Sequence, residues 1–151
     1  AVVVVSADLG MALALIDEGT SLNQRLTPLA QEDVAAFEAC MAAVGRDEED
    51  EGRQSALNAA ADTAVEVPLK TAQLCAAALA LTQQAGEHIE QQFVSDAHAG
   101  ARLMHASLHS VLLNVDANAK QLGSDDARNR ARLSRDGLAE RADALLAAIT
   151  G

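Results

Sequence analysis

Apolar residues recur at intervals of three and four along most of this chain, the spacing that places side chains on one face of an α-helix. The clearest such face begins at Leu22 and continues to Val44 at intervals of four, three, four, four, three and four. Asp33 lies in the middle of that face, where a helix normally carries an apolar side chain. The same spacing predicts helices over residues 3–16, 21–44, 53–66, 68–86, 95–122 and from 124 onward.

Glycine, proline and capping residues mark the ends of the expected helices. Gly45 and Gly86 follow long apolar segments and are predicted to end them, whereas Pro68 is expected to break or kink its segment. Ser95 and Ser124 are N-cap candidates, because a serine hydroxyl can accept a hydrogen bond from a free backbone N–H at a helix start. Short connections between long amphipathic helices predict an all-α fold, an antiparallel helical bundle of five to six helices.

The composition agrees with this helical interpretation and adds an expectation about assembly. Alanine and other helix-favouring residues dominate, and the chain has two Phe and neither Trp nor Tyr. With 151 residues and no shift in composition, residues 1–151 are expected to form a single all-helical domain. Because few large side chains are available for a core, we expect the bundle to bury part of its surface against a second copy, as a homodimer.

The net charge and the two cysteines indicate which partners the protein can bind and in which cellular compartment it is expected. A net charge of −11 opposes binding to nucleic-acid phosphates and to anionic membranes, so neither partner is expected. No uninterrupted apolar run reaches the roughly 18 residues of a membrane span, and no basic segment precedes the apolar start as in a signal peptide. Cys40 and Cys75 lie alone in apolar surroundings, which favours reduced thiols and a cytoplasmic protein.

The spacing alone leaves two interpretations of Asp33. A carboxylate at the edge of a helix face is commonly solvated or paired with an arginine. Alternatively, a half-buried carboxylate can hold or transfer a proton near neutral pH, because desolvation favours its protonated form.

Two asparagines one helical turn apart, Asn114 and Asn118, extend the apolar face of the helix expected over 95–122. Each carboxamide offers both donors and an acceptor, so the pair could hold a flat polar heterocycle. The same groups could instead bond to a neighbouring helix across a tight interface. Both interpretations remain open.

A row of polar residues follows the other face of the same helix. It contains His105 and His109, at a spacing that can chelate zinc or nickel, with His98 and Asp116 nearby. The row also contains arginine and lysine, and it lacks the glutamate of the His-Glu-x-x-His zinc motif. These features favour an exposed polar face, and we expect no metal site.

Lys70 directly follows Val-Pro-Leu, at a position expected to begin a helix. A cation there opposes the helix dipole, which makes an anionic ligand for Lys70 an alternative to simple solvation. Lys70 is therefore a candidate binding residue.

Four motifs resemble, in the same order, those of the family that joins formiminotetrahydrofolate cyclodeaminase and methenyltetrahydrofolate cyclohydrolase. They are Asp-Val-Ala-Ala-Phe at 33–37, Val-Pro-Leu at 67–69, Ser-Asp at 95–96 and Asn-Val-Asp-Ala-Asn at 114–118. The likeness covers about residues 29–122. The family's Pro-Gly-Gly-Gly element and lysine-rich stretch do not occur in this sequence, and we expect the chain to begin just after the place of the glycine-rich N-terminal element.

The resemblance implies an all-α cyclodeaminase-like fold, a homodimer and a reduced folate as substrate, with no cofactor bound permanently. It makes Asp33 the acid/base residue and makes Asn114, Asn118, Asp96 and Lys70 candidate substrate-binding residues. The implied activity is hydrolysis of 5,10-methenyltetrahydrofolate to 10-formyltetrahydrofolate. Cyclodeamination of formiminotetrahydrofolate, and a non-catalytic helical dimer that binds folate or a partner, are the alternatives.

Overall fold

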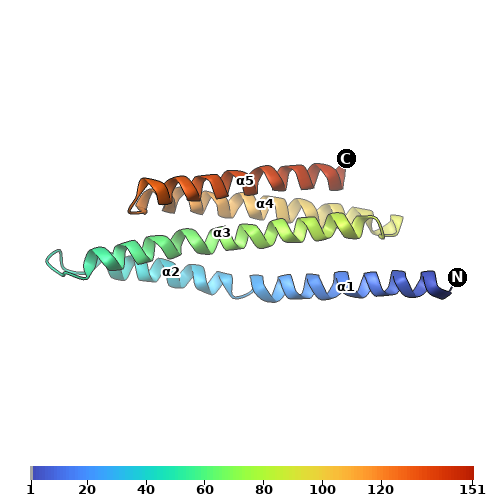
Figure 1. The fold of residues 1–151 in the computed structure, drawn as a ribbon, viewed down its shortest axis with the longest axis horizontal. Helices are drawn as coiled ribbons and strands as arrows, with labels where there is room; N and C mark the ends of the chain where they lie inside the picture. The colour runs from blue at the N-terminus through green and yellow to red at the C-terminus, as the bar shows by residue number, and fades with distance from the viewer. Residues whose placement is uncertain (1) are drawn as a thin grey trace.

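A computed structural model describes residues 2–151, with side chains described from residue 10 onward, and these residues form helices and no strand. The elements are α1 (Val2–Leu26), α2 (Leu29–Val44), α3 (Arg53–Gly86), the 3₁₀ turn η1 (Gln91–Phe93), α4 (Val94–Asn118), the 3₁₀ turn η2 (Ala119–Gln121) and α5 (Asp125–Thr150). Figure 1 shows α1 and α2 following one another along one line, with α3, α4 and α5 each reversing direction beside them. The predicted all-α class is confirmed, as an antiparallel bundle whose first rod consists of two helices.

The first two helices divide at Pro28 rather than at the predicted break over residues 17–21. α1 continues through that segment, where the hydroxyl of Thr20 donates to the carbonyl oxygen of Ile16 at 2.8 Å and follows the helical course. Pro28 has no N–H to donate to the preceding turn, so α1 ends just before it. The prediction of one helix over 21–44 was therefore wrong.

α3 is one continuous helix, although two helices separated at Pro68 were predicted. A proline cannot donate to the carbonyl oxygen four residues earlier, which here belongs to Ala64. That oxygen instead accepts a hydrogen bond from the side-chain Nδ2 of Asn118 on α4, at 2.7 Å. Because the neighbouring helix supplies the missing donor, α3 continues through the proline. Lys70 therefore lies inside α3, and its predicted place at a helix start was wrong.

Of the residues predicted to mark helix ends, Ser124 and Gly45 are confirmed and Ser95 is not. α4 begins after Phe93, so Ser95 lies in its first turn and is not its N-cap. Ser124 is confirmed as the N-cap of α5, since its Oγ accepts a hydrogen bond from the backbone N–H of Ala127 at 3.2 Å. Gly45 is confirmed as the residue at which α2 ends.

α3 lies at the centre of the bundle and contacts each of the other four α-helices. By length and composition alone it could also cross a membrane, but 44% of its apolar window is buried inside the bundle. Contacts with four helices are a sufficient reason for this apolar composition. The largest fully buried side chains are Leu79 of α3 and Leu108, Leu112 and Val115 of α4.

The face of α2 that packs against the bundle shares Leu29 with the face predicted through Asp33 but differs from it beyond that residue. Its buried residues are Leu29, Ala36 and Ala43, whereas Phe37 of the predicted face is 65% exposed. Small alanine side chains let two helices approach closely, which favours them over phenylalanine at the contact. The face that carries Asp33 and Phe37 consequently lies at the edge of the contact between α2 and the rest of the bundle, where both residues line a cavity.

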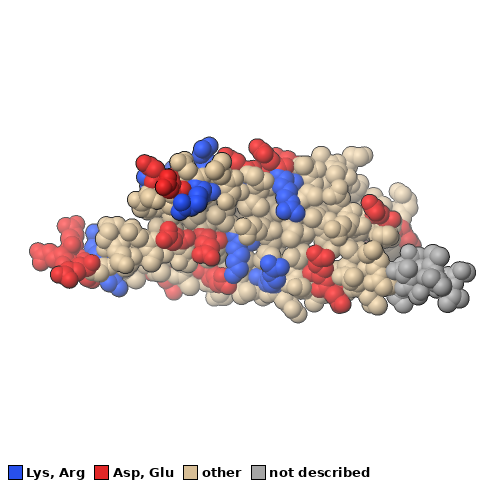
Figure 2. All heavy atoms as spheres, viewed as in Figure 1, with Lys and Arg blue, Asp and Glu red and all other residues tan. Residues whose placement is uncertain are grey.

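Acidic residues gather at the tip of the molecule where α2 is connected to α3. The connecting loop contains five consecutive acidic residues over 47–51, and Figure 2 shows them as a cluster at one end. Arg46 pairs with Asp50 at 3.4 Å, which offsets only part of this charge. The cluster would repel a polyanion from this end of the bundle.

Candidate functional site

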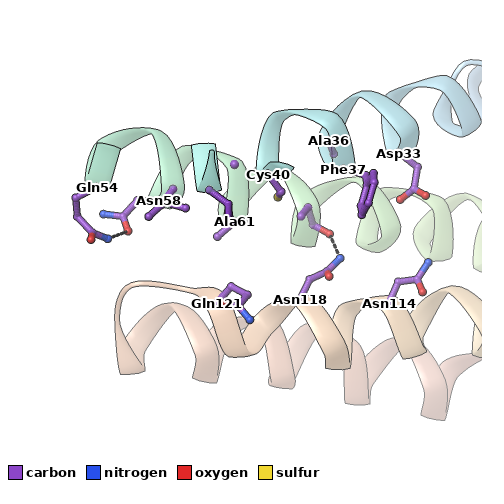
Figure 3. A pocket seen from close by; sticks show the side chains of 14 residues that line it. Asp33, Ala36, Phe37, Cys40, Gln54, Asn58, Ala61, Asn114, Asn118 and Gln121 are labelled. Carbon is purple, nitrogen blue, oxygen red and sulfur yellow. Dashed lines mark hydrogen bonds between the residues drawn. The ribbon is translucent and has the colours of Figure 1, made fainter. Parts of the chain in front are cut away.

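A cavity of about 600 Å³ lies between α2, α3, α4 and the turn η2. Its volume falls in the range of small-molecule sites, roughly 300–1,000 Å³. More than half of its lining residues are apolar, and Figure 3 shows amide and carboxylate side chains among them. The lining residues are Asp33, Ala36, Phe37, Cys40, Val44, Gln54, Leu57, Asn58, Ala60, Ala61, Ala64, Asn114, Asn118 and Gln121.

Asp33 and Asn114 lie across from one another at one end of this cavity. Asp33 projects from α2 and Asn114 from α4, into the space between the two helices (Figure 3). Asp33 is the one charged side chain among the described residues that line the cavity. It is exposed in the single chain, so the predicted half-burial is not found. Its place on the cavity wall opposite Asn114 brings the carboxylate to the cavity, and its catalytic role stays a prediction.

Asn118 has the interhelical role that the sequence left open, and it also borders the cavity. Its Nδ2 donates to the carbonyl oxygen of Ala64, and this bond sets the orientation of the carboxamide, because only the amide nitrogen can donate to a carbonyl. The Oδ1 of Asn118 is thereby left as an acceptor on the cavity wall (Figure 3). Pro68 thus positions Asn118 indirectly, by leaving the Ala64 oxygen free to accept.

Three further amides at the other end of the cavity were missed by the sequence analysis. Gln54 and Asn58 are one turn apart on α3, and Gln54 Nε2 donates to Asn58 Oδ1 at 3.0 Å. Gln121 approaches from η2 (Figure 3). The four-residue spacing of Gln54 and Asn58 is the signal that singled out Asn114 and Asn118, and it could have identified this pair as well.

Lys70 and Asp96, the other two predicted binding residues, do not line this cavity. The Nζ of Lys70 lies 3.2 Å from the carboxylate of Glu32, in an exposed pair between α3 and α2. Asp96 lies in the first turn of α4, and the 18 residues to Asn114 span about 27 Å along a helix. Within one chain, the structure therefore brings together Asp33, Asn114 and Asn118 but not Lys70 and Asp96.

Both cysteines are free thiols. Burial raises the pKa of the Cys75 thiol, which keeps it protonated and unreactive. Cys40 is half-buried and contributes to the wall of the cavity. The cavity therefore offers a carboxylate, several amides and one thiol to a ligand.

The molecule is an antiparallel helical bundle with a ligand-sized cavity, whose carboxylate can exchange a proton and whose amides can donate and accept hydrogen bonds. Residues 6–136 match the family model described as formiminotransferase-cyclodeaminase. The chain is also 35% identical over 146 residues to a protein named methenyltetrahydrofolate cyclohydrolase from Methylorubrum extorquens AM1, covering 93% of this chain and 68% of that protein. The chain belongs to the formiminotransferase-cyclodeaminase family, which confirms the resemblance carried by its motifs.

Proposed function

We propose that this protein is a methenyltetrahydrofolate cyclohydrolase, an enzyme of one-carbon folate metabolism that hydrolyses 5,10-methenyltetrahydrofolate to 10-formyltetrahydrofolate. The observation that carries the proposal is the placement of Asp33 and Asn114 on facing walls of a ligand-sized cavity. Membership of the family and the activity in the name of the relative support it.

The reaction needs proton transfer around one carbon atom. The methenyl carbon bridges N5 and N10 of the folate, and water adds to it to give a tetrahedral intermediate. The bond from this carbon to N5 then breaks and leaves the formyl group on N10. In the proposed mechanism the Asp33 carboxylate accepts one proton of the attacking water and delivers it to the departing N5. The second proton leaves the new hydroxyl group for solvent as the formyl C=O bond forms, so the hydrolysis releases one proton overall. A positioned acid–base group contributes roughly 10²–10⁴-fold to the rate.

The remaining cavity residues suit the pterin ring of a reduced folate. The edge of that ring presents both donors and acceptors, which Asn114 and the free Oδ1 of Asn118 can match. Phe37, exposed at the cavity wall, offers a flat apolar surface to one face of the ring. The folate enters as substrate, and the proposed reaction needs no permanently bound cofactor.

The test is to replace Asp33 with asparagine and to follow the loss of absorbance of the methenyl substrate. Asp33→Asn keeps the size of the side chain and removes its basicity, so kcat should fall by roughly 10²–10⁴-fold. Glu38→Gln removes an equal charge from an exposed position of the same helix that does not line the cavity, and it should leave kcat near the wild-type value. Wild-type kcat in a folded Asp33→Asn variant would remove Asp33 from the mechanism.

The family description supports one alternative activity, formiminotetrahydrofolate cyclodeaminase, which is a lyase. Here N10 attacks the formimino carbon held on N5, and ammonia leaves the resulting tetrahedral centre while Asp33 transfers the protons. Ammonia release from formiminotetrahydrofolate, without hydrolysis of the methenyl compound, would select this alternative. Calorimetric binding of a folate with turnover of neither substrate would select the non-catalytic interpretation.

We also propose that the active unit is a homodimer in the reducing cytoplasm. Asp96 borders a shallow apolar surface with Ile16 and Phe93, both exposed, as expected for a side chain at the edge of an intersubunit contact. In such an assembly Asp96 of one copy would contact the folate bound to the second copy.

A further inference from the structure

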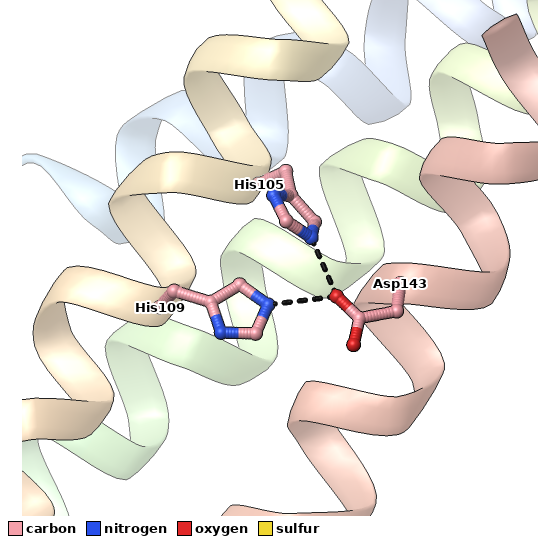
Figure 4. Close-up of side chains that lie close together, drawn as sticks. All are labelled: His105, His109 and Asp143. Carbon is pink, nitrogen blue, oxygen red and sulfur yellow. Dashed lines mark hydrogen bonds and ion pairs between the residues drawn. The ribbon is translucent and has the colours of Figure 1, made fainter.

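Two histidines of α4 and one aspartate of α5 converge on a single carboxylate oxygen. The Nε2 of His105 lies 2.7 Å from Asp143 Oδ1, and the Nε2 of His109 lies 3.0 Å from the same atom. Figure 4 shows both imidazoles turned toward this oxygen from adjacent turns of α4. A carboxylate can only accept, so each imidazole donates its Nε2–H in the metal-free state.

The third member of this cluster could not be identified from the sequence. Sequence spacing identified His105 and His109 but offered only His98 and Asp116 as further ligands. In the structure Asp116 is paired with Arg135 at 3.2 Å, and His98 lines a separate depression between α3, α4 and α5. The fold supplies Asp143 instead, 34 residues from His109 along the chain.

We propose that His105, His109 and Asp143 bind a divalent late first-row transition-metal ion, of which Zn²⁺ is the representative. One potential ligand atom from each residue lies within 4.8 Å of the others. Imidazole nitrogen and carboxylate oxygen are ligands that Zn²⁺ accepts at about 2.0–2.2 Å, and three protein ligands leave a further position for water.

The observed spacing is close to what such an ion requires. Tetrahedral ligands at those bond lengths lie about 3.3 Å from one another. Each imidazole would move away from Asp143 by roughly half an ångström, and the two imidazole nitrogens, now within 4.8 Å of one another, would adopt the same spacing. The side chains have room to do so, because 23% of His105, 35% of His109 and 62% of Asp143 is exposed.

The charge state of the ligands also favours a cation. An aspartate carries a negative charge at neutral pH, so Asp143 offers the ion an anionic ligand beside two imidazoles. The net charge of −11 adds a general attraction for cations.

The metal site is separate from the folate cavity. His105 and Asn114 are nine residues apart on α4, which corresponds to a rotation of about 180° around the helix. The metal would therefore join α4 to α5 on the face opposite to Asn114. Because an ion bound only by the folded state stabilises that state, we expect it to act as a clamp between these helices.

The experiment uses untagged protein freed of metal with a chelator and titrated calorimetrically with ZnCl₂. We expect saturable binding of about one Zn²⁺ per chain and a rise in Tm of several degrees at saturation. Co²⁺ should give the visible spectrum of a tetrahedral site without thiolate-to-metal charge transfer. A saturating titration that yields no binding, or a cobalt–thiolate spectrum, would overturn the proposal.

Matched variants locate the site. Asp143→Asn and His105→Ala each remove one ligand and should weaken Zn²⁺ binding by at least about tenfold. Asp136→Asn removes a charge two turns earlier on α5, and His98→Ala removes a histidine two turns earlier on α4, so both should bind Zn²⁺ like the wild type. Circular dichroism establishes that each variant is folded, and His109→Ala replaces any that is not. Binding retained in the ligand variants, or lost equally in the controls, would contradict the assignment.

Discussion

At the scale of single residues, Asp33 derives its proposed role from what it faces rather than from burial. Its side chain is exposed, yet it is the one charge on the wall of a cavity whose opposite wall carries Asn114. The sequence singled out both residues by type and spacing. It could not show that they face each other, because the two positions are 81 residues apart and meet only when α2 and α4 pack on α3.

Asn114→Ala should reduce kcat/KM of the proposed hydrolysis by roughly three- to tenfold. This is the loss expected for one neutral hydrogen bond to the substrate, about 0.5–1.5 kcal/mol. Steady-state kinetics would measure it. Asn129→Ala, at an exposed position of α5, is the control and should retain wild-type kinetics. A kcat/KM within error of wild type for Asn114→Ala would remove this residue from the binding site.

The Asp143 pair with the two histidines predicts a pH-dependent contribution to stability in the metal-free protein. Because the folded-state pKa of Asp143 is lowered, its ionised form stabilises the fold above the usual value of 3.8, and this contribution is lost as the pH falls through the lowered value. Urea denaturation at neutral pH should therefore show a smaller free energy of unfolding for Asp143→Asn than for wild type. The difference should shrink in acid, whereas a difference that widens below pH 3.8 would contradict this assignment.

At the scale of helices, Pro68 and Asn118 form one structural unit. The proline leaves the Ala64 carbonyl oxygen without its helical donor, and Asn118 supplies another from α4. Sequence reasoning identified Pro68 as a helix breaker and Asn118 as an amide on a helix face. It predicted a break in α3 because local preference was all it could weigh, whereas the compensating donor comes from 54 residues away.

A double-mutant cycle tests this unit. Asn118→Ala leaves the Ala64 oxygen unpaired and should lower the free energy of unfolding by about 1–3 kcal/mol. Adding Pro68→Ala restores a backbone N–H that can donate to that oxygen, so it should recover most of the stability but not the turnover. Urea denaturation of the wild type, both single variants and the double variant yields the coupling energy. If Asn118→Ala lowers the free energy of unfolding by the same amount in the wild type and in the Pro68→Ala variant, the two residues are independent.

At the scale of the whole molecule, the class of fold was predictable and the arrangement of surfaces was not. Alanine-rich periodic segments and short connections specify a helical bundle, and α3 is apolar enough along its length to serve as its centre. The predicted buried stripe through Phe37 and Val44 was wrong, because Ala36 and Ala43 allow a closer approach of α2 to α3. Periodicity alone could not show this, since the alanines form a second stripe with the same spacing.

The large apolar side chains left exposed on α1 and α2 argue for a second copy of the chain. α1 contacts α3 along one side, while Met11, Leu13 and Ile16 remain about half exposed or more. Exposed large apolar side chains on two consecutive helices are typical of a protein–protein contact surface. Burial of α1 and α2 against a partner would also reduce the solvent exposure of Asp33. It would agree with the expectation that a core of small residues buries further surface by dimerisation.

Ile16→Glu should therefore convert a dimeric wild type to monomer, because association would bury the new carboxylate without a partner charge. Sedimentation velocity measures the shift, and turnover should fall with the dimer population if the second copy completes the site. Leu133→Glu places the same charge at an equally exposed leucine of α5, away from α1 and α2, and should leave the association unchanged. A wild type that sediments as a monomer at the concentrations where it turns over substrate would rule out the dimer as the active unit.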